Sequence, residues 1–133
     1  MPFVSITRLR LRSARFLPGF LWFSLLSTLQ AKRSPGNLGM SGLRDANLAF
    51  WTATLWENEA AMRVFMLSGA HRRAMPKLAR WADEAAVAHW TQDCTDLPDW
   101  TEAHRRLSTE GCMSKVNHPS PRQLAREIPA PRV

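Results

Sequence analysis

The stretch of residues 49–90 constrains the fold most, because its hydrophobic periodicity changes twice. Residues 48–56 alternate with a period of two, and both alternating sets are largely apolar. Helical spacing begins after Glu57, is interrupted by a Ser-Gly pair, and continues to residue 81 before alternation returns over residues 84–92. The pattern predicts a strand, a split helix and a second strand, in a sheet that is buried on both faces.

The rest of the chain supplies the other elements of one fold. Residues 3–11 alternate as a strand whose second face changes from apolar to basic, and residues 13–31 carry a broad apolar helical face. We expect a short strand over residues 37–43 and a last helix over residues 97–107. The succession strand, helix, strand, strand, split helix, strand predicts a ferredoxin-like α+β domain with an antiparallel sheet.

The carboxyl-terminal residues have a different composition. A chain of 133 residues is long enough for one domain with its own core. We place a ferredoxin-like domain over residues 1–112. Residues 113–133 are rich in proline, basic and polar side chains, and we expect them to form a poorly ordered tail.

The positive charge is concentrated at the amino terminus. Residues 1–44 contain seven basic residues and no acidic residue, whereas the basic and acidic residues of 45–133 balance at 11 each. Such a segment attracts phosphate or anionic lipid, but it lacks a nucleic-acid-binding signature. The apolar run of residues 16–26 is too short to span a membrane. We therefore expect no nucleic-acid partner and no membrane partner.

The cysteines and histidines show no metal-binding spacing. Cys94 and Cys112 are the only cysteines, they form no CxxC pair, and the four histidines are scattered. Two free thiols are typical of a reducing compartment. We therefore expect a cytoplasmic protein without a dedicated metal-binding cluster.

Three segments carry a family resemblance: SPGNLG, FWTATLWENEAAMRVF and SGAHRRAMPKLARW. With them, residues 3–90 resemble the dimeric α/β-barrel superfamily, which contains antibiotic-biosynthesis monooxygenases and heme-degrading monooxygenases. Within it, the segments look like an uncharacterised bacterial family that is similar to spheroidene monooxygenase. In that superfamily, sheets from two chains pack face to face as a closed barrel. The resemblance implies a homodimer in which the second apolar face of the sheet meets the partner chain.

The resemblance singles out His71, because ligands of such relatives lie between the sheet and its helices, close to the split helix. His71 is thus the candidate catalytic residue, as an acid or base that acts on a bound substrate. It is also the candidate axial ligand of a heme iron, the one metal site that we consider. The remaining alternative is a structural histidine that is hydrogen-bonded to backbone at a helix start.

Further site candidates follow from the same resemblance. The Asn, Trp and His of the heme-degrading relatives fall at Thr7, Phe65 and Met75 in an approximate register, so this chain departs from their pattern. Arg8 and Arg10 are candidates for binding heme propionates or another anion. The substrate-pocket candidates are Thr7, Trp51, Trp56, Phe65, Met75 and His89.

The function that we expect is that of a monooxygenase-like oxidoreductase, which acts on or binds a small hydrophobic molecule. Heme is the cofactor that the resemblance leaves open, and otherwise we expect none. The alternative is a noncatalytic homodimer that binds a small ligand or has a structural role. Hydrolase chemistry has little support, since no Ser-His-Asp order and no paired carboxylates stand out.

Overall fold

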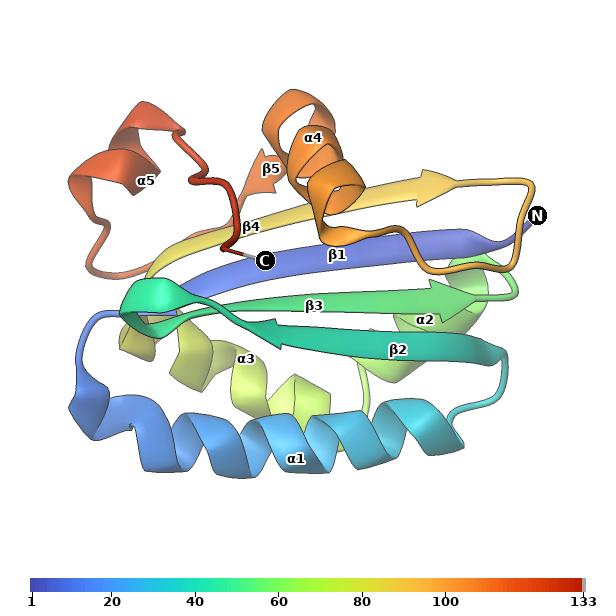
Figure 1. Cartoon of the computed structure of the whole chain (residues 1–133). Helices are drawn as coiled ribbons and strands as arrows, with labels where there is room; N and C mark the ends of the chain where they lie inside the picture. Colours follow the sequence, from blue (N-terminus) through green and yellow to red (C-terminus); the bar gives the residue numbers. More distant parts are fainter. Residues whose placement is uncertain (133) are drawn as a thin grey trace.

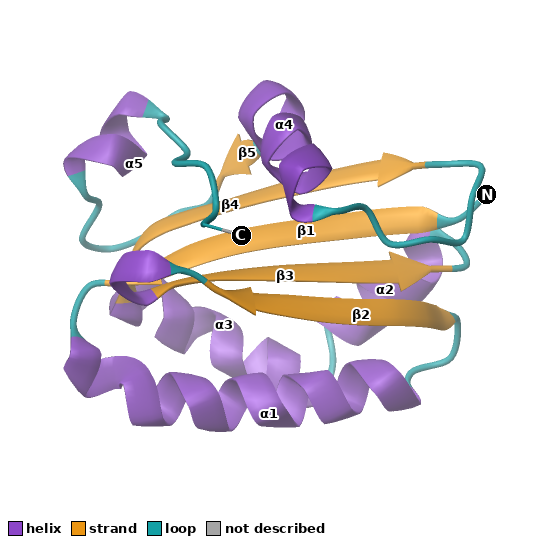
Figure 2. Cartoon of the chain, viewed as in Figure 1, coloured by secondary structure: helices purple, strands orange, loops and turns teal. Residues whose placement is uncertain are grey.

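The computed structural model describes residues 1–132 and contains a five-stranded antiparallel sheet in the order β2-β3-β1-β4-β5, with helices on both faces (Figures 1 and 2). This ferredoxin-like α+β fold confirms the predicted fold class, and the described sheet is open rather than closed into a barrel. The strands are β1 (Phe3–Leu11), β2 (Asn37–Arg44), β3 (Ala49–Trp56), β4 (Ala82–Thr91) and β5 (Cys112–Met113). The α-helices are α1 (Leu17–Arg33), α2 (Glu59–Met66), α3 (Gly69–Trp81), α4 (Trp100–Glu110) and α5 (Pro121–Ala125).

Short-range sequence signals set most helix starts. The side chains of Asn58 and Asp99 accept hydrogen bonds from the first turns of α2 and α4, as their positions predict. Ser13 differs, because it begins a short 3₁₀ turn and α1 starts only at Leu17. Within the described residues, no helix is both long and apolar enough to cross a bilayer.

The face of the sheet that carries α4, here called the α4 face, is closed by the chain itself. Figure 1 shows α4 and α5 on one side of the sheet, with α1, α2 and α3 on the other. On the α4 face, Trp51 and Leu55 of β3 pack with Ala103 and Leu107 of α4 in one buried cluster. The prediction that this face is free to meet a partner chain is therefore wrong, because α4 already covers it.

The carboxyl-terminal segment is packed, in contrast to the loose tail that we expected from its composition. Gln123 of α5 is buried, and its side chain accepts a hydrogen bond from the Ala85 N–H and donates to the Ala85 carbonyl, both at 3.0 Å. The strand β5 pairs only with Ala86 and Val87 of β4, so Gln123 supplies hydrogen-bond partners for the backbone of the next residue, Ala85. Ile128 packs on the cluster of the α4 face, and its carbonyl lies 2.8 Å from Nε2 of His104.

The opposite face of the sheet is filled only at its two ends. At one end, Phe3 and Trp56 form a buried cluster with Phe65 of α2. At the other end, Leu11 packs with Phe20 of α1. The middle of this face, which we call the cavity face, lies between these two clusters.

The packing of α4 generates a stability prediction. Leu107 is 1% exposed, so we expect Leu107→Ala to lower the free energy of unfolding by about 2–5 kcal/mol through lost burial and an unfilled cavity. The matched control is Leu124→Ala in α5, where the leucine is 73% exposed and the loss should stay within about 0.5 kcal/mol. Urea denaturation measures both, and equal losses would contradict the packing of α4 on the sheet.

Candidate functional site

A cavity of about 530 Å³ lies between the cavity face and the helices α1, α2 and α3. Its volume is within the range of small-molecule sites, roughly 300–1,000 Å³. Most of its wall is apolar and includes several flexible methionine side chains, which adapt to ligands of different shape. The methionines are Met40, Met62, Met66 and Met75.

Hydroxyl groups form the floor of this cavity. Ser5 of β1 pairs with Thr54 of β3, and Thr7 pairs with Thr52, so that two rows of hydroxyl side chains cross the middle of the sheet. Strand alternation places all four on the same face. Their side chains are too small to fill the space between the two end clusters, which leaves the cavity open and gives its apolar wall a polar floor.

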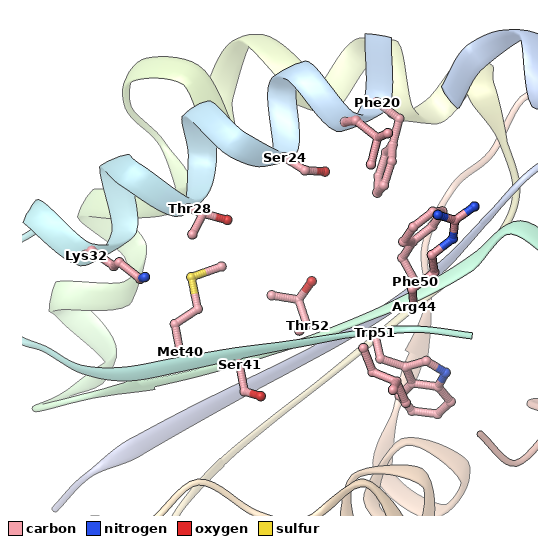
Figure 3. A pocket seen from close by; sticks show the side chains of 13 residues that line it. Phe20, Ser24, Thr28, Lys32, Met40, Ser41, Arg44, Phe50, Trp51 and Thr52 are labelled. Atoms are coloured by element: carbon pink, nitrogen blue, oxygen red, sulfur yellow. The ribbon is translucent and has the colours of Figure 1, made fainter. Parts of the chain in front are cut away.

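Helix α1 adds a second group of hydroxyls opposite the floor. Ser24, Ser27 and Thr28 all line the cavity, since residues at spacings i, i+3 and i+4 share one side of a helix. Figure 3 shows Ser24 and Thr28 reaching from α1 towards Thr52 of the sheet. Together, the two groups can orient the polar atoms of a ligand whose body is apolar.

An adjoining cavity of about 340 Å³ continues this space towards the edge strand β2. The two cavities share lining residues, among them Phe20 and Met40, and are two parts of one site. Figure 3 shows Lys32 at the α1 side of the adjoining cavity, and it shows Trp51 pointing away from α1. The adjoining cavity is therefore an open part of the site at the β2 edge, beside a basic residue.

His71 lies in the cavity wall at the start of α3, held there by Gln30 of α1. The Gln30 side chain accepts a hydrogen bond from the His71 N–H at 3.0 Å and donates to the Ser68 carbonyl at 2.7 Å. Gly69 permits the close approach of the Gln30 side chain to the start of α3, because its φ of +58° favours glycine and an added Cβ would lie 3.0 Å from Gln30. Sequence reasoning found His71 and the Ser-Gly break but missed Gln30.

The surroundings of the His71 ring favour a neutral imidazole with one free nitrogen. Nδ1 lies 3.1 Å from the Met66 carbonyl, an acceptor, so Nδ1 carries the proton and Nε2 keeps its lone pair. Burial lowers the pKa of His71 below the ordinary 6.5, and the hydrogen bond to Met66 opposes that shift only in part. The ring also packs on Phe65 at 4.8 Å between centroids. A neutral His71 can accept a proton at neutral pH.

Several predicted pocket residues do come together around this cavity. Thr7, Phe65 and Met75 line it, as does His89 of β4. His89 is exposed at the rim, with its ring 5.4 Å from that of Phe3, and burial of part of the ring lowers the pKa of His89. Ser5, Thr52 and Thr54 were missed, although their alternation with Thr7 and along β3 puts them on the same face.

The two tryptophan candidates do not line the larger cavity. Trp51 points to the α4 face, where its ring packs against those of Trp100 and His104. Trp56 is on the cavity face but is fully buried in an end cluster, stacked on Phe65 at 5.2 Å. Both side chains are core residues in this fold.

The two arginine candidates lie on the α4 face, with the sheet between them and His71. Arg8 is buried, and its guanidinium donates to Glu84 at 2.8 Å, while Arg10 pairs with Asp83 at 2.7 Å. Neither can bind propionates of a heme in the cavity. The residues predicted for heme therefore do not form one site. Among residues 1–132, no three His, Cys, Asp or Glu side chains form a group that could hold a metal ion.

Comparisons with known proteins agree with this fold. The family described as Domain of unknown function (DUF3291) matches residues 2–112. None of the curated proteins matches the chain. SnoaB, a cofactor-independent oxygenase from Streptomyces nogalater, superposes with a TM-score of 0.58 and 15% identity over 74% of this chain and 98% of its own.

Two further structures show the same likeness. One is described as an antibiotic biosynthesis monooxygenase, with a TM-score of 0.61 and 13% identity over 69% of this chain and 99% of its own. The other is Rv0793 from Mycobacterium tuberculosis, with a TM-score of 0.62 and 11% identity over 71% and 97%. The resemblance read from the sequence is thus confirmed at the level of the fold.

The ion pair between Arg8 and Glu84 generates a second stability prediction. Glu84→Gln leaves a buried guanidinium without its counter-charge, and we expect it to lower the free energy of unfolding by about 3–5 kcal/mol. The matched control is Glu59→Gln, which breaks an exposed pair with Arg63 and should cost no more than about 1 kcal/mol. Chemical denaturation at neutral pH compares the two variants.

The same pair predicts a pH dependence. Burial opposes ionisation of Glu84, but hydrogen bonds from Arg8 and Ser120 and the nearby charges outweigh burial and lower the pKa of Glu84. A carboxyl whose pKa is lowered by folding adds stability above its unfolded value of about 4.3, and this stability is lost as the pH falls through the folded value. The difference between wild type and Glu84→Gln should therefore shrink on acidification below pH ~4.3, and a constant difference would contradict the assignment.

Proposed function

The chain belongs to the DUF3291 family, and we propose that it is a monooxygenase-like oxidoreductase that acts on a small hydrophobic molecule in the cavity beside His71. The observation that carries the proposal is the combination of a largely apolar cavity with a neutral, backbone-oriented histidine in its wall. The fold shared with SnoaB and with an antibiotic biosynthesis monooxygenase supports the same reaction class.

The cavity favours a mostly apolar substrate with a few polar atoms. Apolar walls of methionine and aromatic side chains favour removal of such a molecule from water. The hydroxyls of the sheet floor and of α1 are placed to bind carbonyl or phenol oxygens from two sides, which would fix the orientation of the substrate towards His71.

In the proposed reaction, Nε2 of His71 is the general base. It takes a proton from an acidic C–H group of the substrate and leaves an electron-rich carbanion. The carbanion supplies the electrons that reduce O₂, so that a CH₂ group and O₂ become a C=O group and water. All electrons come from the substrate, and the overall reaction needs no further reductant.

This proposal assigns no role to heme. The arginines that would bind propionates are paired with carboxylates on the α4 face, and the positions that match the heme-degrading relatives hold Thr7, Phe65 and Met75. SnoaB is described as cofactor-independent, which supports the same chemistry for this cavity.

The test uses anthrone, a planar tricyclic ketone with an acidic CH₂ group, and measures oxygen uptake above the rate in buffer. Wild-type protein should accelerate uptake, and His71→Ala should lower the rate constant by about 100-fold or more, the usual contribution of a general base. The matched control is His118→Ala, since His118 is exposed and does not line the cavity.

The pH profile tests the role of His71 as a base. Because the protonated ring cannot accept a proton, the rate should fall as the pH drops through the lowered pKa of His71, below 6.5. Equal rates for His71→Ala and wild type would refute the assignment. Anthrone binding without oxygen uptake, detected by quenching of tryptophan fluorescence, would favour the noncatalytic ligand-binding alternative.

A further inference from the structure

Helix α1 is apolar on two opposite sides. Its inner side packs on the sheet, where Phe20 and Ala31 are buried. On its outer side, large apolar side chains recur at the spacings of one helix face and remain exposed, which is unusual for a contiguous set. We call this set the α1 stripe: Leu21, Trp22, Leu25 and Leu29, with exposed fractions of 46, 58, 53 and 41%.

Helix α1, which carries the stripe, and the neighbouring helix α3 are basic and hold no acidic residue. Helices α1 and α3 together with the turn before α1, residues 14–33 and 69–81, contain no Asp or Glu. They contain seven cations, none of which forms an ion pair with another residue of the described chain. The cations are Arg15, Lys32, Arg33, Arg72, Arg73, Lys77 and Arg80.

The two helices lie side by side, so the stripe and these cations belong to one layer. A Cβ added to Gly19 would lie 2.9 Å from the Trp81 ring, which shows how closely α1 approaches α3. The Nζ atom of Lys77 lies 5.7 Å from the centroid of the Phe23 ring. In Figure 1 both helices lie on the same side of the sheet, away from α4 and α5.

We propose that the α1–α3 layer binds the surface of an anionic lipid bilayer. The stripe would enter the boundary between headgroups and acyl chains, and the seven cations would contact the negative headgroups. The exposed Trp22 of the stripe suits the membrane interface, because its ring is apolar and its N–H is polar. A helix that lies in the interface needs no membrane-spanning length, which was the basis for expecting no membrane partner.

Charge distinguishes a bilayer from the other possible occupants. A second copy that packed through the same helices would bring the seven cations of its α1–α3 layer against these seven, and neither helix holds an acidic residue to neutralise them. Like charges in an interface are unfavourable. Nucleic acid would match the charge, but its phosphates would leave the stripe exposed to water. An anionic surface with an apolar interior satisfies both the cations and the stripe.

The cavity lies next to the proposed membrane-binding surface. Leu21 belongs to the stripe and also lines the cavity that opens beside β2, together with Lys32. A protein bound in this orientation would have the entrance of its site next to the lipid. An apolar ligand could then pass from the bilayer into the cavity without crossing water.

The test is flotation of the full chain with phosphatidylcholine vesicles that contain about one third phosphatidylglycerol. The negative headgroup of phosphatidylglycerol attracts basic protein surfaces. Binding should be about tenfold or more stronger than to pure phosphatidylcholine and should weaken with added salt, because salt screens the charges. Two double variants should each bind about tenfold more weakly than wild type. One combines Trp22→Ser with Leu25→Ser in the stripe, and the other combines Arg72→Glu with Arg73→Glu in α3.

Matched controls lie on the other side of the sheet. Leu124→Ser and Arg122→Glu in α5 change an exposed leucine and an exposed arginine far from the stripe, and both should bind as wild type does. Trp22→Phe keeps the apolar surface, so it should still bind. It should, however, lose the part of the fluorescence quenching by brominated phosphatidylglycerol that comes from Trp22.

Three results would overturn the proposal. The first is no binding to the anionic vesicles, and the second is equal binding by wild type and both double variants. The third is a wild-type dimer in light scattering that Trp22→Ser with Leu25→Ser converts to a monomer, which would assign the stripe to a second copy. The vesicle assay needs no turnover, so its failure and a failure of the proposed reaction are distinguishable.

Discussion

A sheet that is apolar on both faces needs other elements packed on each face to shield it from water. The rest of this structure depends on which elements cover each face. On the α4 face, alanines of β3 and β4 alternate with Trp51 and Trp90, and α4 fits closely over them. The carboxyl-terminal segment completes the cover through Gln123 and Ile128. One chain therefore closes a face that, in the resembling superfamily, meets a second chain.

The cavity face is covered in a different way, and the difference explains the site. Large side chains close its two ends, at Phe3 with Trp56 and at Leu11 with Phe20. They support α1 and α3 above a middle region whose strand residues are Ser and Thr. Short hydroxyl side chains cannot reach the helices, so the space between them stays open. The same packing holds α1 so that one of its apolar sides stays outside the core.

Much of the fold could be predicted because its signals are local, whereas the site could be predicted only in part. The family resemblance, and not a local pattern, singled out His71 beside the Ser-Gly break, and Thr7 came from the approximate register with the heme-degrading relatives. Arg8 lies apart from the cavity for a reason visible in the sequence: neighbouring residues of a strand face opposite sides, so Thr7 and Arg8 cannot line the same pocket. The resemblance to heme proteins, and not the periodicity, suggested Arg8.

The sequence by itself determined strands β1 to β4, helices α1 to α4 and the face on which their side chains lie, because the periods of two and 3.6 and the capping residues act over a few neighbouring positions. Only the tertiary structure decided what covers each face. The docking of α4 over β3, the hydrogen bonds of Gln123 to Ala85 and the reach of Gln30 to His71 join segments far apart in the chain. Such contacts depend on shape and on the summed burial of many weak contacts, which no local pattern encodes.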